Sequence, residues 1–232
     1  MSQSGADIAL GPGQGRALGW ALIACAVATV ALLANHPGGA AHSFAEMLHN
    51  EAANQVSDAV VHGGFIAVMA VELVCFAGLA VRLGPVRTPV LAAMIFTAAG
   101  FLALAGSMIV DGLVTPALAA RYVAGPADQL DAARLLLALC GALIRFLMPM
   151  GLAFQAAGTV AWGAAFLSGR GLARATGVGG LVLGAAILIG LAATAAGLNP
   201  LVLMGALAGQ AMWIVAVGLT LSQGRSEGWY AS

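Results

Sequence analysis

Six long apolar runs constrain this 232-residue chain more than any other feature of its sequence. The runs cover residues 17–34, 59–81, 90–110, 135–167, 177–198 and 201–221. An α-helix of about 20 residues crosses the hydrocarbon core of a bilayer, and each run approaches or exceeds that length. Because 61% of the residues are hydrophobic and only 8% are charged, a water-soluble globule could not bury the apolar side chains. The sequence therefore predicts an all-α protein, a polytopic transmembrane bundle of about six helices in contact with a lipid bilayer.

The arginines predict how these helices are oriented. All nine basic residues are Arg, and six of them lie in or beside connections on one side: Arg16, Arg82, Arg87, Arg170, Arg174 and Arg225. Cytoplasmic loops are enriched in basic residues, so this side is predicted to be cytoplasmic. Residues 1–16 and 223–232 are then cytoplasmic tails around a transmembrane domain of residues 17–222. We expect a multi-pass protein of a bacterial inner membrane, with both termini in the cytoplasm.

A short amphipathic segment separates the first two apolar runs. In residues 41–58 the apolar residues recur at steps of three and four, while polar residues gather on a different face. The segment has too little apolar length to cross a membrane, and a helix of this kind lies in the plane of the interface. We therefore expect an interfacial helix on the exterior side, between the first and second transmembrane helices.

His42, Glu46 and His49 of this segment form a candidate metal site. Their i, i+4 and i+7 spacing places them on one helix face, where they could reach one ion. Imidazole and carboxylate ligands suit zinc or another divalent transition metal, and His62 is a candidate fourth ligand. The same pattern also fits a solvated polar face or a cluster of histidines that responds to pH.

Seven polar residues in or beside the apolar runs form a candidate pathway for a ligand or ion: His36, His62, Glu72, Asp111, Arg145, Gln155 and Gln210. A rise of about 1.5 Å per residue from the cytoplasmic arginines puts Glu72 near the bilayer midplane. Gln155 and Gln210 reach a comparable depth. A carboxyl group there lines a cavity, pairs with a partner or carries a proton. Glu72 could therefore join helices through a hydrogen bond to one amide, or serve in a relay for protons or cations.

The remaining pathway residues approach the exterior face. All four histidines of the chain fall on this side, which makes the clustering informative. Asp111 and Arg145 lie at similar depth on neighbouring runs, and we expect them to form an ion pair. His36 and His62 end adjacent helices, so the two imidazoles could instead ligate one haem.

Glycine spacing predicts close packing of the last two transmembrane helices. Gly180 and Gly184 are four residues apart, as are Gly205 and Gly209, so each pair shares one helix face. Such pairs let helix backbones approach closely. We expect a tight hairpin of these two helices, and either face also offers a surface for a homo-oligomer.

Three short sequences in the first half of the chain carry a resemblance. Residues 35–39 read Asn-His-Pro-Gly-Gly, residues 61–64 read Val-His-Gly-Gly, and residues 111–116 read Asp-Gly-Leu-Val-Thr-Pro. This pattern resembles uncharacterised multi-pass bacterial membrane proteins of about six helices. The resemblance implies the fold class and the membrane location, and it brings no substrate, cofactor or reaction.

Three functions fit these observations. The first is binding or translocation of a small ligand, a proton or a metal ion through a polar mouth on the exterior side. The second is a non-catalytic membrane scaffold or accessory subunit, and the third is a haem-binding redox protein. The chain lacks the motifs of soluble hydrolases, nucleotide-binding proteins and dinucleotide enzymes, which favours a non-enzymatic role. The scattered arginines argue against a nucleic-acid partner.

Overall fold

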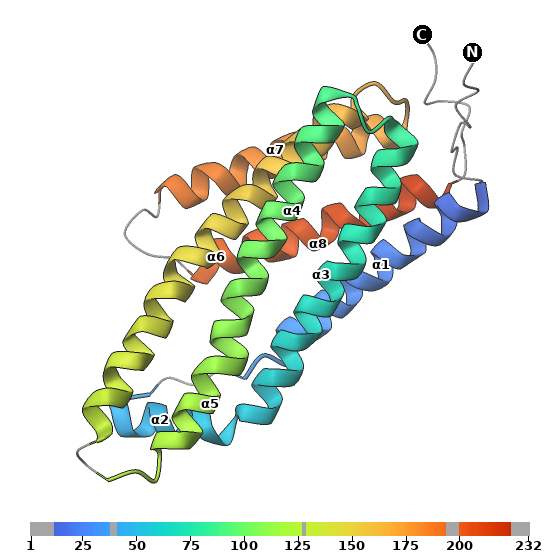
Figure 1. Ribbon diagram of the computed structural model, residues 1–232. Coiled ribbons are helices and arrows are strands. Elements are labelled where there is room, and N and C mark those ends of the chain that lie inside the picture. The colour runs from blue at the N-terminus through green and yellow to red at the C-terminus, as the bar shows by residue number, and fades with distance from the viewer. Residues whose placement is uncertain (1–11, 38–40, 127–128, 194–199, 224–232) are drawn as a thin grey trace, which may run out of the picture.

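The chain folds into a bundle of helices in the computed structural model (Figure 1). The structure describes residues 12–37, 41–126, 129–193 and 200–223. Within these residues there is no strand, and six helices are long and apolar enough to cross a membrane. The predicted all-α class is therefore confirmed. Most of both tails, Gly38, Gly39 and the connection before Pro200 lie outside the described residues.

The helices follow the predicted runs, with extensions at several ends. The long helices are α1 (Pro12–Ala34), α3 (Gln55–Leu83), α4 (Thr88–Ile109), α6 (Leu130–Phe166), α7 (Leu172–Ala193) and α8 (Pro200–Ser222). Two short helices are α2 (Phe44–Ala53) and α5 (Thr115–Tyr122). A π-helical turn, η1 (Val110–Val114), joins α4 to α5 without a break. One continuous helical segment therefore runs from Thr88 to Tyr122.

The six long helices form a closed ring. Each contacts the next in the order α1, α3, α4, α6, α7 and α8, and α8 packs back against α1. The short helices α2 and α5 pack against each other at one end of the bundle (Figure 1). The start of α1 and the end of α8 lie at the opposite end (Figure 1). Large apolar side chains remain exposed on the outer surface, among them Val74, Leu102, Leu135, Val182, Ile189 and Met212, as a lipid-facing surface requires.

The predicted amphipathic helix is present as α2. Ser43 caps its first turn, because the Ser43 hydroxyl accepts from the Glu46 amide at 3.1 Å. In return, the Glu46 carboxylate accepts from the His42 amide at 2.8 Å. The apolar face buries Leu48 in a cluster with Ala119 of α5 and Leu137 of α6. The sequence pattern thus identified both the helix and the face that it buries.

The fourth apolar run forms a single helix that is longer than one crossing requires. Helix α6 has 37 residues and is about 55 Å long, which exceeds a hydrocarbon core of about 30 Å. Pro149 lies inside this helix without ending it. The first turns of α6 pack against α2 and α5 at the end of the bundle, through Ala133 and Leu137. The extra length therefore serves to cover the two short helices.

Glycines bring α6 and α7 together. A Cβ on Gly163 would lie 2.8 Å from the carbonyl oxygen of Gly177 and 2.8 Å from the amide nitrogen of Leu181. A Cβ on Gly180 or Gly184 would likewise press on the backbone of α6. The nearest α6 backbone atoms are the carbonyl oxygens of Thr159 and Ala156, at 3.1 and 2.6 Å respectively.

The expected backbone partner of Gly180 and Gly184 was therefore wrong. The nearest backbone atoms to these two glycines belong to α6 and not to the last helix. From the last helix, the Trp213 side chain lies against Gly180. Since both glycines are buried within the chain, their face does not offer a surface for a second copy.

The second glycine pair behaves differently. Gly209 lies against the Leu183 side chain of α7, whereas Gly205 is exposed and an added Cβ there would meet no described atom within 4 Å. The tight contact of α8 is instead with α1, where Gly218 and Gly19 face each other's backbone. A homo-oligomer through Gly205 remains a prediction.

Candidate functional site

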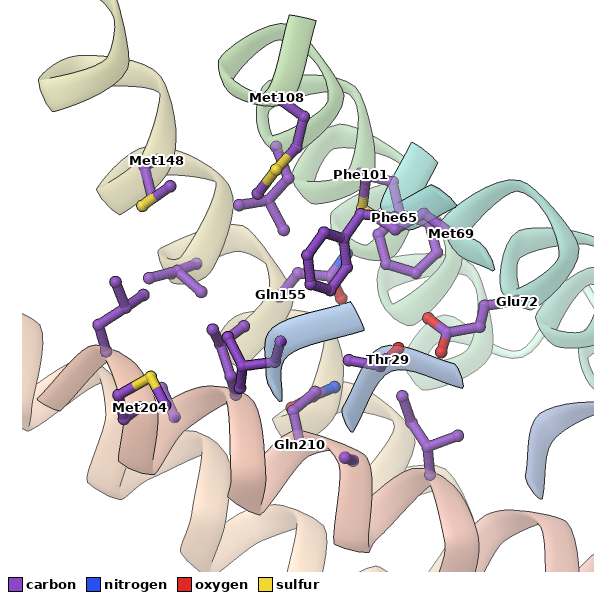
Figure 2. A pocket seen from close by; sticks show the side chains of 18 of the residues that line it. Thr29, Phe65, Met69, Glu72, Phe101, Met108, Met148, Gln155, Met204 and Gln210 are labelled. Atoms are coloured by element: carbon purple, nitrogen blue, oxygen red, sulfur yellow. The ribbon is translucent and has the colours of Figure 1, made fainter. Parts of the chain in front are cut away.

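A cavity of about 330 Å³ lies inside the helix ring (Figure 2). All six long helices contribute to its lining, which is mostly apolar. Four of the nine methionines line it: Met69, Met108, Met148 and Met204. Phe65 and Phe101 add two aromatic rings (Figure 2). Sequence reasoning missed these residues, because an apolar side chain looks alike whether it faces lipid, a neighbouring helix or a cavity.

An aromatic cluster closes one end of the cavity. Phe76 of α3 lines the cavity and stacks on Trp162 of α6 and on Trp213 of α8, at ring-centroid distances of 5.4 and 6.2 Å. Beyond this level, Leu79 and Phe166 are buried in the same apolar cluster. The cavity therefore occupies the half of the bundle on the other side of Phe76.

Glu72 lies in the wall of the cavity. The residue is 4% exposed, and Figure 2 shows its carboxylate pointing from α3 into the cavity, toward Thr29. Within the described part of the chain this carboxylate has no hydrogen bond and no ion pair. A buried polar group without a partner costs free energy. The group is thus placed to receive a hydrogen-bond donor that enters the cavity.

Gln155 and Gln210 form hydrogen bonds to groups other than Glu72. Gln155 donates from Nε2 to the carbonyl oxygen of Thr97 at 3.2 Å, which links α6 to α4. Gln210 pairs with the Thr159 hydroxyl at 3.0 Å, which links α8 to α6. Both side chains line the cavity. A hydrogen bond from Glu72 to either amide, as the sequence suggested, is therefore not formed.

His36, His62 and Asp111 meet at the other end of the cavity. The Nε2 atoms of His36 and His62 are 3.3 Å apart, and Nε2 of His62 is 3.3 Å from Oδ2 of Asp111. One ligand atom from each residue lies within 4.8 Å of the other two. His62 is 2% exposed, the Asp111 side chain is 35% exposed, and His36 is exposed. The three residues come from the end of α1, from α3 and from η1, and all three line the cavity.

The π-helical turn positions Asp111 beside His62. Pro116 has no amide hydrogen, and its ring would clash with the carbonyl group four residues earlier in a regular α-helix. The wider turn of η1 avoids this clash. At its end, the Thr115 hydroxyl donates to the Val110 carbonyl oxygen at 2.8 Å. Gly112 then faces the imidazole so closely that an added Cβ would overlap the Cβ, Cγ and Nδ1 atoms of His62. The Asp-Gly sequence therefore supplies both an acidic group and the space for a buried ring.

The expected ion pair between Asp111 and Arg145 is not formed. Asp111 lies against His62 instead, and Arg145 is exposed and donates from Nε to the Gly141 carbonyl oxygen of its own helix at 3.3 Å. An exposed arginine gains little from leaving solvent for a partly exposed carboxylate. Arg145 is also the one predicted pathway residue outside the cavity lining; the other six are part of it.

The three candidate metal ligands of α2 are not brought together with the histidines of the cavity. His42, Glu46 and His49 are all exposed, and the Glu46 carboxylate accepts from the His42 amide. Among the described residues, the group whose ligand atoms converge is His36, His62 and Asp111. A metal on the α2 face remains a prediction.

The arrangement of His36 and His62 does not suit haem. Two axial imidazoles must lie on opposite faces of the macrocycle, with the porphyrin plane between them. Here the ring centroids are 4.9 Å apart and the rings meet edge to face at 71°. This spacing leaves no room for a porphyrin between the rings.

Comparison with known proteins gave no guide to this site: no family model, no curated protein and no solved structure matched the chain.

Proposed function

We propose that this chain is a membrane protein that binds a small, mostly apolar molecule with a hydrogen-bond-donating head group, such as an amine. Six helices able to cross a membrane are compatible with an integral membrane protein. The observation that carries the proposal is the carboxylate of Glu72, which lies in a largely apolar cavity. Within the described residues this carboxylate has no partner. A donor on the ligand would satisfy this group, while the tail fills the space between the methionines and aromatic rings.

Two further features support binding in preference to translocation. Methionine side chains are flexible and polarisable, so they adapt to apolar ligands of different shape. The stacked cluster of Phe76, Trp162 and Trp213 fills the bundle beyond Glu72, so the cavity ends there. A pathway across the membrane would need this cluster to open, whereas a binding site needs no such movement.

Fluorescence quenching tests this function. We expect 2-(4-bromophenyl)ethylamine to quench tryptophan emission saturably, because Phe76, which lines the cavity, stacks on Trp162 and Trp213, so a molecule bound in the cavity lies close to these two rings. Glu72→Gln should weaken binding of this amine by at least about tenfold, since a hydrogen bond to a charged group contributes about 1.5–3 kcal/mol. Binding of the matched hydrocarbon without a donor, 1-bromo-4-ethylbenzene, should change much less.

The control for this experiment is Glu46→Gln, which removes an exposed carboxylate outside the cavity lining. This variant should bind the amine as the unaltered protein does. Quenching that does not saturate, or that is equal in the Glu72→Gln protein, would show that the amine only partitions into detergent and would contradict the proposal.

We also propose that the protein lies in a bacterial inner membrane, with the α2–α5 end outside and the arginine-rich end in the cytoplasm. The connections after α3 and after α6 share that second end, because Arg87 donates to Ser168 across 3.5 Å. The positive-inside rule assigns such an end to the cytoplasm. In intact bacterial cells, a membrane-impermeant maleimide should label Ala41→Cys and spare Val86→Cys. Both positions are exposed and all three native cysteines are buried, so the reverse pattern would refute the orientation.

A further inference from the structure

The cluster of His36, His62 and Asp111 has a feature that the cavity ligand does not explain: its three polar groups present acceptors to one another. Nδ1 of His62 lies 2.9 Å from the carbonyl oxygen of Asp58, and Nδ1 of His36 lies 2.8 Å from that of Pro37. A carbonyl oxygen only accepts, so both Nδ1 atoms carry the hydrogen. In the neutral rings, each Nε2 atom then bears a lone pair.

These lone pairs converge. The two Nε2 atoms are 3.3 Å apart, and a carboxylate oxygen of Asp111 lies at the same distance from Nε2 of His62. Three acceptors at this separation repel one another unless a positive charge lies between them. A divalent metal ion or a proton would supply that charge.

We propose that His36, His62 and Asp111 bind a divalent transition-metal ion of the zinc type. Zinc binds imidazole nitrogen at about 2.0–2.1 Å and carboxylate oxygen at about 2.0–2.2 Å, so neighbouring ligands of a tetrahedral ion are about 3.3–3.5 Å apart. Two of the three ligand pairs already have this separation. The third pair lies within 4.8 Å, and the exposed His36 and half-buried Asp111 have room to turn toward the ion.

The surroundings of the cluster favour a cation. Hydrogen bonds from Nδ1 to backbone carbonyl groups orient metal-binding imidazoles in proteins, and both rings have one. Buried Asp58 places its own carboxylate 4.0 Å from Nδ1 of His62. Burial, together with the nearby carboxylates of Asp58 and Asp111, raises the pKa of Glu51 on α2. Several carboxyl groups thus surround the two imidazoles, which favours the binding of a divalent cation.

An ion held by three protein ligands keeps at least one coordination position for another group. Its three ligands also line the cavity, so an ion there would border the cavity. The metal site does not depend on the Glu72 ligand, and the two can be tested separately.

Zinc titration of the full-length protein tests the site. The protein is purified in detergent through a tag without histidines, stripped with EDTA and titrated calorimetrically with ZnCl₂ at pH 7.5. We expect one zinc ion per chain, and at least about a tenfold loss of affinity in both His36→Ala and Asp111→Asn. His36 is exposed and Asp111→Asn keeps the side-chain shape, so both variants are expected to fold. Cobalt(II) should give visible ligand-field absorption in the unaltered protein that both variants lose.

Two controls make the result specific. The double variant His42→Ala/His49→Ala removes the exposed histidines of α2 and should keep wild-type zinc affinity. Glu72→Gln should also keep it, which separates this site from the proposed cavity ligand. Absence of zinc and cobalt binding would overturn the proposal and leave a proton as the shared charge. Wild-type affinity in either single variant, or loss of binding in the α2 double variant, would overturn it as well.

Discussion

Gly163→Val is expected to separate α6 from α7 and to lower the free energy of unfolding by on the order of 3 kcal/mol. A Cβ at this position would lie 2.8 Å from two backbone atoms of α7, and backbone cannot rotate away as a side chain can. The helices would have to move apart along a contact that also includes Gly177 and Gly180. In a bilayer, such close packing is a main source of helix association, so the loss is not offset elsewhere.

Denaturation in mixed micelles of increasing sodium dodecyl sulfate content would measure this effect. The matched control is Gly179→Val, because Gly179 lies on α7, is exposed and has no neighbour within 4 Å of an added Cβ among the described residues. This variant should unfold close to the wild-type midpoint. Equal midpoints for Gly163→Val and the unaltered protein would mean that α6 and α7 do not make this contact.

Gly112→Ala is expected to displace the buried His62 ring and to weaken zinc binding at the proposed site. The new methyl group would overlap three atoms of His62, which is 2% exposed and therefore has little room to move. Overpacking of this kind costs about 1–3 kcal/mol, and moving Nε2 of His62 also removes the central ligand of the proposed metal site. The expected result is a lower unfolding midpoint together with zinc affinity at least about tenfold weaker, since each tenfold step corresponds to about 1.4 kcal/mol.

The glycine beside His62 in the sequence supplies the control for this prediction. An added Cβ on Gly63 would meet no atom of the described residues within 4 Å, so Gly63→Ala should leave the unfolding midpoint close to that of the unaltered protein. The double variant Gly112→Ala/His62→Ala should recover part of the stability lost by Gly112→Ala, because the second change removes the ring that the methyl group strikes. Strictly additive losses would show that the two residues do not meet.

The histidines illustrate how far the sequence could lead to the site. Their position relative to the arginines predicted that His36, His62 and Asp111 approach the same end of the bundle, and the structure brings these three together. The sequence paired Asp111 with Arg145 because the two have opposite charge at similar depth. Depth does not specify the direction in which a side chain points around its helix, and η1 turns Asp111 toward His62.

The candidate metal ligands of α2 show how far spacing alone can lead. The spacing of His42, Glu46 and His49 is correct for one helix face, and α2 is the helix that this spacing requires. A short-range pattern cannot distinguish ligands from polar residues of a solvated helix face, and the Glu46 carboxylate binds the His42 amide. The group that converges among the described residues joins positions that are 26 and 49 apart in the sequence, which no short-range pattern could show.

The sequence by itself determined the helices, because bilayer thickness fixes how long an apolar run must be and amphipathic spacing identifies α2. The tertiary structure alone decided which helices are neighbours around the ring and which face each turns inward. It placed Gly180 and Gly184 against α6, left Glu72 without a partner among the described residues, and gathered His36, His62 and Asp111 from three segments. The physical reason is that lipid and protein interior are both apolar. A hydrophobic pattern therefore marks what lies in the membrane, but only the close fit of side chains and backbone selects the contacts.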